Sequence, residues 1–249
     1  MAKNKPDTKK EQEVQEATEQ IECVEVTPEQ LELLTDNGMQ TVMNIGLAER
    51  LYLEDLADRI FYCDTNITND LLHSITMQIY KINGMDKGID TYDRQPIVII
   101  LNSFGGDVFE GISLMDAVSQ SKTPVIGICV GHCASMAFGI YSVCHVRIAM
   151  PNSVFMYHDG SEAVYNTATK ADDWFKFSPK LTNRIDKMIA SHSKFTVEML
   201  QNIAPHDNWW FADEMQEKGI VDHIIGKDIE IEDIFGFMSD NVEFTDEVS

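Results

Sequence analysis

From residue 51 onward, the sequence alternates between short uncharged apolar runs and segments whose apolar residues recur at helical spacing. Short β-branched runs are typical of buried strands, and the longer segments are typical of amphipathic helices. The predicted strands are 60–63, 97–101, 125–130, 146–149, 154–157 and 220–225. Strands that alternate with helices need crossover connections, which favour a parallel sheet. The sequence therefore predicts an α/β fold with a mainly parallel sheet that is covered on both faces, with βαβ units and flanking helices.

The predicted helices differ in how clearly their ends are marked. They are 51–57, 68–82, 111–119, 135–143, a mostly helical region over 172–203, a helix opened by Thr196 within that region, and 212–218. Asn83-Gly84 is a helix-ending signal, and Ser178-Pro179 indicates a break or restart in the long region. The aromatic residues of that region, Trp174, Phe175 and Phe177, fit either a core or a subunit interface.

Length and composition predict one folded domain with extensions at both ends. The chain has 249 residues, 44% of them hydrophobic, which suffices for one sizeable core. We expect residues 1–22, rich in Lys, Glu and Gln, to be a disordered extension, and 23–50 to be an N-terminal segment. The folded domain is predicted at 51–226. Residues 227–249 carry eight acidic residues against one lysine and are expected to form a solvated acidic tail.

Charge and hydropathy exclude several kinds of partner. With 19 Lys and Arg against 41 Asp and Glu, the net charge of −22 argues against binding to nucleic acid or to an anionic membrane surface. No apolar run approaches the roughly 20 residues of a membrane-spanning helix. The first residues also lack the apolar core of a secretory signal, so we expect a cytoplasmic protein.

The cysteines suggest neither disulfides nor a metal site. Five cysteines at irregular spacings give no disulfide framework, which fits a reducing compartment. The spacing from Cys129 to Cys133 is too isolated for a zinc site. We therefore expect no metal and no organic cofactor.

Ser135 lies where a predicted strand gives way to a predicted helix. Free N–H groups and the positive end of the helix dipole favour a developing negative charge at such a junction, as acyl transfer requires. A serine at this place is also a common helix N-cap, and its position alone does not choose between these roles.

Two further segments follow predicted strands and supply complementary chemistry. Gly105-Gly106 can expose backbone N–H groups toward an oxyanion, although an ordinary tight turn would use the same residues. His158, at the end of an apolar strand, suits a general base, whereas His132 lies too close to Ser135 in sequence to face it. An acid must orient the imidazole. Spacing does not choose among the candidates Asp159, Asp172, Asp173, Asp207, Asp213 and Asp222.

Four motifs, in order, resemble the proteolytic subunit of the Clp protease. They are Asn102-Ser103-Phe104-Gly105-Gly106, Gly131-His132-Cys133-Ala134-Ser135-Met136-Ala137, Pro151-Asn152-Ser153 with Met156-Tyr157-His158, and Asp207-Asn208-Trp209-Trp210-Phe211-Ala212-Asp213-Glu214. The resemblance covers roughly residues 51–226 and implies the fold that Clp proteases share with crotonases.

The resemblance also assigns roles to residues. It implies that Ser135 is the nucleophile, His158 the general base and Asp207 the orienting acid, with the backbone N–H groups of Gly106 and Met136 as the oxyanion hole. It further implies a serine endopeptidase that cleaves unfolded or extended polypeptide. Such an enzyme would act in a homo-oligomeric ring of seven subunits or a double ring, fed by a partner ATPase (an AAA+ unfoldase).

Several positions depart from the family pattern. Phe104 replaces a proline and Cys133 an alanine, and Asp159-Gly160 replaces Gln-Pro. The segment 161–169, which in the family joins two rings, is short, and Pro205-His206 stands where the family has an arginine used between rings. These departures leave ring stacking open.

Other functions of the same or a related fold also stay open. They are a phage head-maturation protease, a catalytically silent ring scaffold, and an acyl-CoA lyase or hydratase of the crotonase type.

Overall fold

The computed structural model describes residues 47–160 and 167–236. The chain divides into two compact units, Met1–Leu53 and Glu54–Ser249. Of the first unit only the start of helix α3 (Leu47–Ala57) is described, so the account below concerns the second unit. The predicted disordered extension 1–22, most of the segment 23–50 and the last part of the acidic tail lie outside the described residues.

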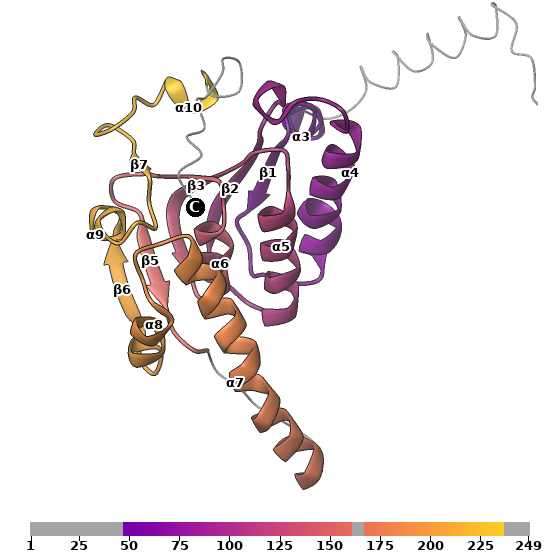
Figure 1. Ribbon diagram of the computed structural model, residues 1–249. Helices are drawn as coiled ribbons and strands as arrows, with labels where there is room; N and C mark the ends of the chain where they lie inside the picture. The colour runs from indigo at the N-terminus through magenta and orange to yellow at the C-terminus, as the bar shows by residue number, and fades with distance from the viewer. Residues whose placement is uncertain (1–46, 161–166, 237–249) are drawn as a thin grey trace, which may run out of the picture. The chain divides into compact units, whose positions relative to one another are not determined.

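Seven strands form one sheet in the spatial order β1-β2-β3-β4-β7, with β5 beside β3 and β6 beside β5 (Figure 1). The strands are β1 (Ile60–Cys63), β2 (Ile97–Ser103), β3 (Val125–Ala134), β4 (Val146–Ala149), β5 (Val154–Tyr157), β6 (Asn208–Phe211) and β7 (His223–Ile224). All their pairings are parallel except that of β5 with β6. The predicted α/β class with a mainly parallel sheet is therefore confirmed.

Helices cover one face of this sheet and form the main core. They are the π-helical η1 (Leu72–Thr76), α4 (Met77–Met85), α5 (Val108–Gln120), α6 (Met136–Ser142), α7 (Ala168–Ser191), α8 (Val197–Ile203) and α9 (Ala212–Glu217). The structure also has the 3-10 helix η2 (Thr91–Asp93) and, on the opposite face of the sheet, the short helix α10 (Asp233–Gly236). Every residue of α6 is buried between the sheet and its neighbours. Because α6 follows β3 directly, the junction between them is held rigidly.

The opposite face of the sheet is covered in part by residues of the acidic tail. Ile229 and Ile234 pack against a cluster of strand residues that includes Val98, Ile126 and Ile148. Residues 227–234 thus contribute two half-buried isoleucines to this face, and their other residues are exposed. A parallel sheet has two apolar faces to bury, and these isoleucines cover part of the second.

Strand β3 is longer than predicted and changes its partner along its length. The prediction ended at Val130, but the strand runs on to Ala134 because its second part pairs with β5. On the β2 side, Cys129 lies opposite Leu101 and Cys133 opposite Ser103, so the strand carries a bulge between them. A side chain at Gly131 would come within 2.4 Å of the Asn102 Oδ1 atom, so a larger residue there would have to displace the Asn102 side chain.

Four further elements differ from the prediction. Strand β6 was not predicted, and the last strand shrinks from 220–225 to the two residues of β7. Helix α4 continues through Asn83-Gly84 to Met85, because the Asn83 side chain bonds Ser121 and the backbone of Lys122 instead of ending the helix. Helix α7 runs unbroken through Pro179.

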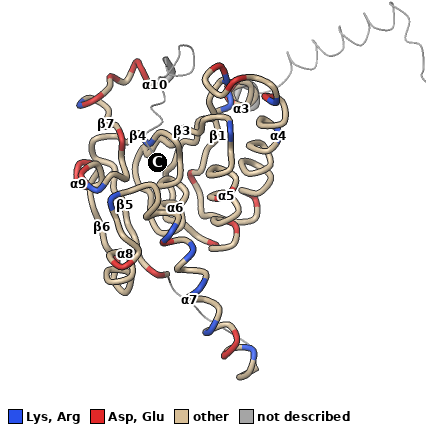
Figure 2. The backbone as a smooth tube through the Cα atoms, viewed as in Figure 1, with Lys and Arg blue, Asp and Glu red and all other residues tan. Residues whose placement is uncertain are grey.

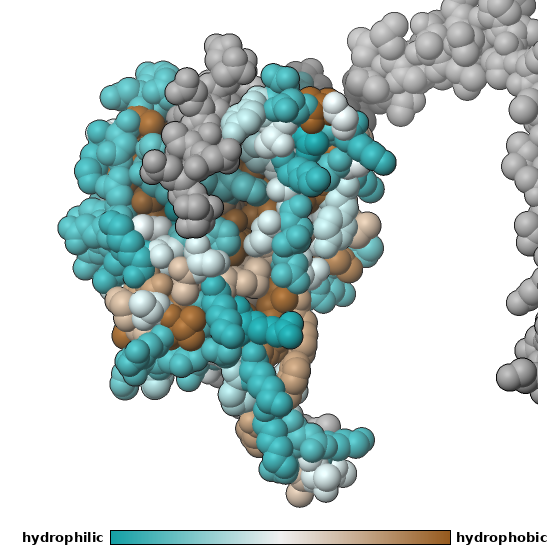
Figure 3. Space-filling model, in the orientation of Figure 1, coloured by the Kyte–Doolittle hydropathy of each residue, from teal (hydrophilic) through white to brown (hydrophobic). Residues whose placement is uncertain are grey.

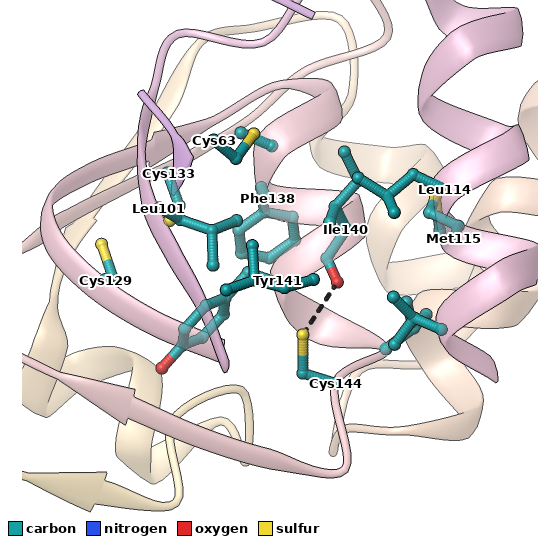
Figure 4. Close-up of a cluster of buried hydrophobic side chains, with 14 of the residues drawn as sticks. Cys63, Leu101, Leu114, Met115, Cys129, Cys133, Phe138, Ile140, Tyr141 and Cys144 are labelled. Carbon is teal, nitrogen blue, oxygen red and sulfur yellow. Dashed lines mark hydrogen bonds between the residues drawn. The ribbon is translucent and has the colours of Figure 1, made fainter. Parts of the chain in front are cut away.

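The visible surface is mostly polar, whereas the core is mostly apolar. The face seen in Figure 3 is largely hydrophilic. Inside, the free thiols of Cys63, Cys129, Cys133 and Cys144 lie among large apolar side chains such as Phe138 and Tyr141 (Figure 4). Burial raises the pKa of Cys63 and of Cys144 to about 12, so these thiols stay protonated and act as small apolar groups.

Candidate active site

Ser135 occupies the single residue between the end of β3 and the start of α6. Its backbone has φ 53° and ψ −123°, a conformation that non-glycine residues seldom adopt. Its N–H donates to the Met156 carbonyl at 2.9 Å, which fastens the strained residue to β5. Strain of this kind persists only where the surroundings impose it, and it is concentrated at functional sites.

His158 and Asp207 meet because of the pairing between β5 and β6. The two strands run antiparallel, with Tyr157 opposite Asn208, so the next residues along, His158 and Asp207, also face each other. The His158 Nδ1 and Asp207 Oδ1 atoms are 2.9 Å apart, and the Asn208 amide donates to the Ile203 carbonyl at 2.7 Å, which fixes the connection before β6. Strand β6, absent from the sequence prediction, is what brings the acid to the imidazole.

The imidazole also reaches the serine. The His158 Nε2 and Ser135 Oγ atoms are 2.9 Å apart. With the ring proton on Nδ1, the imidazole donates to Asp207 and accepts from the Ser135 hydroxyl. The His158 side chain is 23% exposed and that of Asp207 62% exposed. The structure therefore brings Ser135, His158 and Asp207 into one hydrogen-bonded series, which is the arrangement that nucleophilic serine chemistry uses.

The glycine loop after β2 packs directly against the serine junction. A side chain at Gly105, where φ is +95°, would come within 2.8 Å of the Ser135 Cβ and 2.9 Å of the Met136 nitrogen. The bridge to Ile67 uses the Gly105 carbonyl and the Asp107 N–H, and so leaves the Gly106 N–H outside it. Met136 begins α6, so its N–H has no acceptor within the helix. Gly106 and Met136 line the same cleft as Ser135, so their N–H groups are the candidate backbone donors.

The other candidate residues have different surroundings. Asp222 forms a bidentate pair with Arg147, and Asp172 bonds Lys176 within α7. The ring of His132 lies 4.0 Å from that of Phe104, centre to centre. Of the six acids proposed from the sequence, Asp207 is the one that bonds His158.

The serine and the histidine open onto a cleft with a volume of about 960 Å³. Its walls come from the glycine loop, the start of α5, the end of β5 and one face of α7. Two of its residues, Tyr157 and Asp186, bond each other and were not singled out in the sequence. The sequence does not mark Asp186 as a site residue, because its bonding partner lies on a strand far away along the chain.

The sequence also matches a known protein family. Residues 47–228 match the family model described as Clp protease, which covers well over half of the 249 residues. The chain therefore belongs to the Clp protease family.

Two further findings concern the described residues alone. None of their helices is long and apolar enough to cross a membrane. Within the same ranges, no three side chains of His, Cys, Asp or Glu gather as ligands for a metal ion would.

Proposed function

We propose that this protein is a serine endopeptidase of the Clp type. Ser135 Oγ attacks the peptide carbonyl while His158 Nε2 takes the hydroxyl proton, and Asp207 stabilises the imidazolium that forms. The oxyanion accepts hydrogen bonds from the N–H groups of Gly106 and Met136. His158 then gives its proton to the leaving amine, and water hydrolyses the acyl-enzyme on Ser135.

One observation carries this proposal: the two 2.9 Å contacts that join Ser135 to His158 and His158 to Asp207. A scaffold subunit without activity would not need to retain this series. A hydratase or lyase of the crotonase type would need the backbone donors but not the three side chains. The complete series therefore favours peptide hydrolysis over both alternatives.

The substrate and the assembly that we propose rest on family membership, on the open cleft and on exposed aromatic side chains. We take the substrate to be unfolded or extended polypeptide, because the cleft beside Ser135, with a volume of about 960 Å³, is open to solvent. We also propose a homo-oligomeric ring, fed by a partner ATPase in the cytoplasm. Phe175 and Phe177 on α7, 57% and 45% exposed, would be covered in such a ring.

An active-site probe tests the chemistry. A fluorophosphonate should form one adduct on the intact protein, and peptide mapping should place it on Ser135. Ser135→Ala should abolish the adduct, whereas Ser74→Ala, at an exposed serine that bonds only the Asp70 carbonyl, should label like the wild type. Labelling that survives Ser135→Ala, or wild-type protein that never labels, contradicts the proposal.

A further inference from the structure

The cleft beside Ser135 is acidic. Apart from Asp207, three carboxylates line it, from Asp107, Asp159 and Asp186, and within the described residues no lysine or arginine does. Helix α7 carries five basic residues, visible along it in Figure 2, yet none of them is on the face that lines the cleft. The charge of the cleft therefore favours a cationic group in the substrate.

Asp186 is the most buried of these acids. It is 0% exposed, and its Oδ1 accepts a hydrogen bond from the Tyr157 hydroxyl at 2.5 Å. Its Oδ2 forms no hydrogen bond with any described residue. The nearby Gln201 amide instead donates to Asn183 at 3.2 Å. A buried carboxyl oxygen without a donor is unfavourable, so its place in the cleft wall points to a donor supplied by a ligand.

The other acids of the cleft are less suited to this role. Asp107 is the N-cap of α5, where its Oδ1 already accepts from the N–H groups of Phe109 and Glu110. Asp159 directly follows the proposed base, His158, and is exposed to solvent, where a charge is screened. Asp186 alone combines burial with an oxygen that has no partner.

Apolar side chains surround the approach to Asp186. Leu181, Ile185 and Ile189, on the same helix, line the cleft, as does Met136 on α6. A lysine or arginine side chain fits such surroundings, because its methylene stem packs on apolar groups while its cationic head seeks an acceptor. A substrate residue with a purely apolar side chain would leave the Asp186 oxygen unsatisfied.

We propose that Asp186 is a specificity-determining residue, which binds the cationic head of a lysine or arginine of the polypeptide substrate. This inference rests on the proposed peptidase function and adds a preference to it. Burial raises the pKa of the Asp186 carboxyl, an effect that the Tyr157 hydroxyl and the nearby Gln201 side chain only partly offset. A bound cation would favour the ionised form.

Matched peptides test the preference. We would place lysine, arginine or norleucine in turn at each position flanking the cleaved bond of an otherwise identical fluorogenic peptide. At one position, the wild type should cleave the lysine and arginine peptides with a kcat/KM at least about tenfold above that of the norleucine peptide. The measured quantity is this ratio, so a general loss of activity does not imitate it.

Two substitutions at position 186 make the test specific. Asp186→Asn, which keeps the size, should reduce the lysine-to-norleucine ratio to near one, whereas Asp186→Glu, which keeps the charge, should retain a preference for lysine. A ratio that Asp186→Asn leaves unchanged means a structural role only and overturns the inference. So does wild-type cleavage without any preference for cationic residues, which leaves the peptidase function standing. Failure to cleave any peptide overturns the proposed function itself.

Discussion

At the scale of single residues, the site depends on backbone positions that few residue types tolerate. Ser135 has a positive φ of 53°, and Gly106 contacts Ile67 so closely that a Cβ atom would lie 2.4 Å from the Ile67 carbonyl oxygen. The conformation of Ser135 sets the direction of its hydroxyl, and the glycine lets the loop pack closely on Ile67. Both features depend on the conformation and packing of the backbone.

Replacing Gly106 by alanine should damage turnover more than folding. The new methyl group would displace the loop from Ile67 and move one proposed oxyanion donor, so kcat for peptide cleavage should fall by about 10²- to 10³-fold. Gly84→Ala is the matched control, because nothing lies within 4 Å of its added methyl group. Steady-state kinetics of both variants checks this, and equal activities would remove Gly106 from the oxyanion hole.

A buried ion pair elsewhere should make stability depend on pH. Asp86 is 2% exposed, and Arg59 donates two hydrogen bonds to it, at 2.7 and 2.8 Å. Burial alone would raise the pKa of Asp86, but the hydrogen bonds from Arg59 and Thr123 hold it below its ordinary value of 3.8. The stability from this ionised carboxylate is therefore present above about pH 4 and is lost as the pH falls through the lowered pKa.

Asp86→Asn should accordingly cost about 3–5 kcal/mol of unfolding free energy at pH 7, because it leaves Arg59 buried without its counter-charge. The difference from wild type should shrink below about pH 4. Urea unfolding at several pH values measures both, with Asp116→Asn, at an exposed position on α5, as control. A loss of stability that does not change with pH would contradict the ion-pair account.

Residues of the site were predictable where their signal was local. Ser135, His158 and the glycine pair each follow an apolar run, and parallel strands present their ends at one edge of the sheet. Asp207 was not separable from five other acids by spacing alone, because its contact with His158 depends on a strand pairing between distant segments. The bond between Asp186 and Tyr157 is equally long-range and left no trace in the sequence.

At the scale of elements, the short apolar strands were predicted best. Strands β1, β4 and β5 begin and end at the predicted residues. In β1 and β5 the signal is an uninterrupted apolar run, and in β4 a single arginine interrupts it. The end of β3, with Gly131 and His132, lacks that signal and becomes a strand only through pairing with β5. The residues of strand β6 are alternately half-buried and exposed, although all but the first are aromatic. The sequence therefore does not show the alternation of apolar and polar residues that marks a half-buried strand.

Helix α7 is a second case in which tertiary structure overrides a local preference. Pro179 lies in its middle and lacks the N–H that would bond the preceding turn. Pro179→Ala should therefore stabilise the protein by about 1–3 kcal/mol. Thermal or urea unfolding, with the neighbouring exposed Lys180→Ala as control, measures the gain. Unchanged or lower stability would show that the proline fits α7 without strain.

At the scale of the whole molecule, the acidic composition and the exposed aromatics of α7 have different consequences. The net charge of −22 keeps copies of the chain apart at a distance, whereas Phe175 and Phe177 favour contact between them. In the proposed ring, the charges would lie at its surface and the apolar side chains between subunits.

The mass of the particle in solution tests this assembly. A ring of seven 28.2 kDa chains has a mass of about 197 kDa, and a double ring twice that. Light scattering after size-exclusion chromatography should give one of these values at moderate salt. Phe175→Ser combined with Phe177→Ser should shift the particle toward smaller species. A wild-type monomer would contradict the proposed ring while leaving the chemistry at Ser135 untouched.

The chemistry itself is tested most directly by the hydrolysis of an unfolded protein. Purified wild-type protein should generate new amino termini from it, and Ser135→Ala should reduce the rate to background while the particle mass stays the same. Cleavage by Ser135→Ala at the wild-type rate would contradict the role given to the series of Ser135, His158 and Asp207.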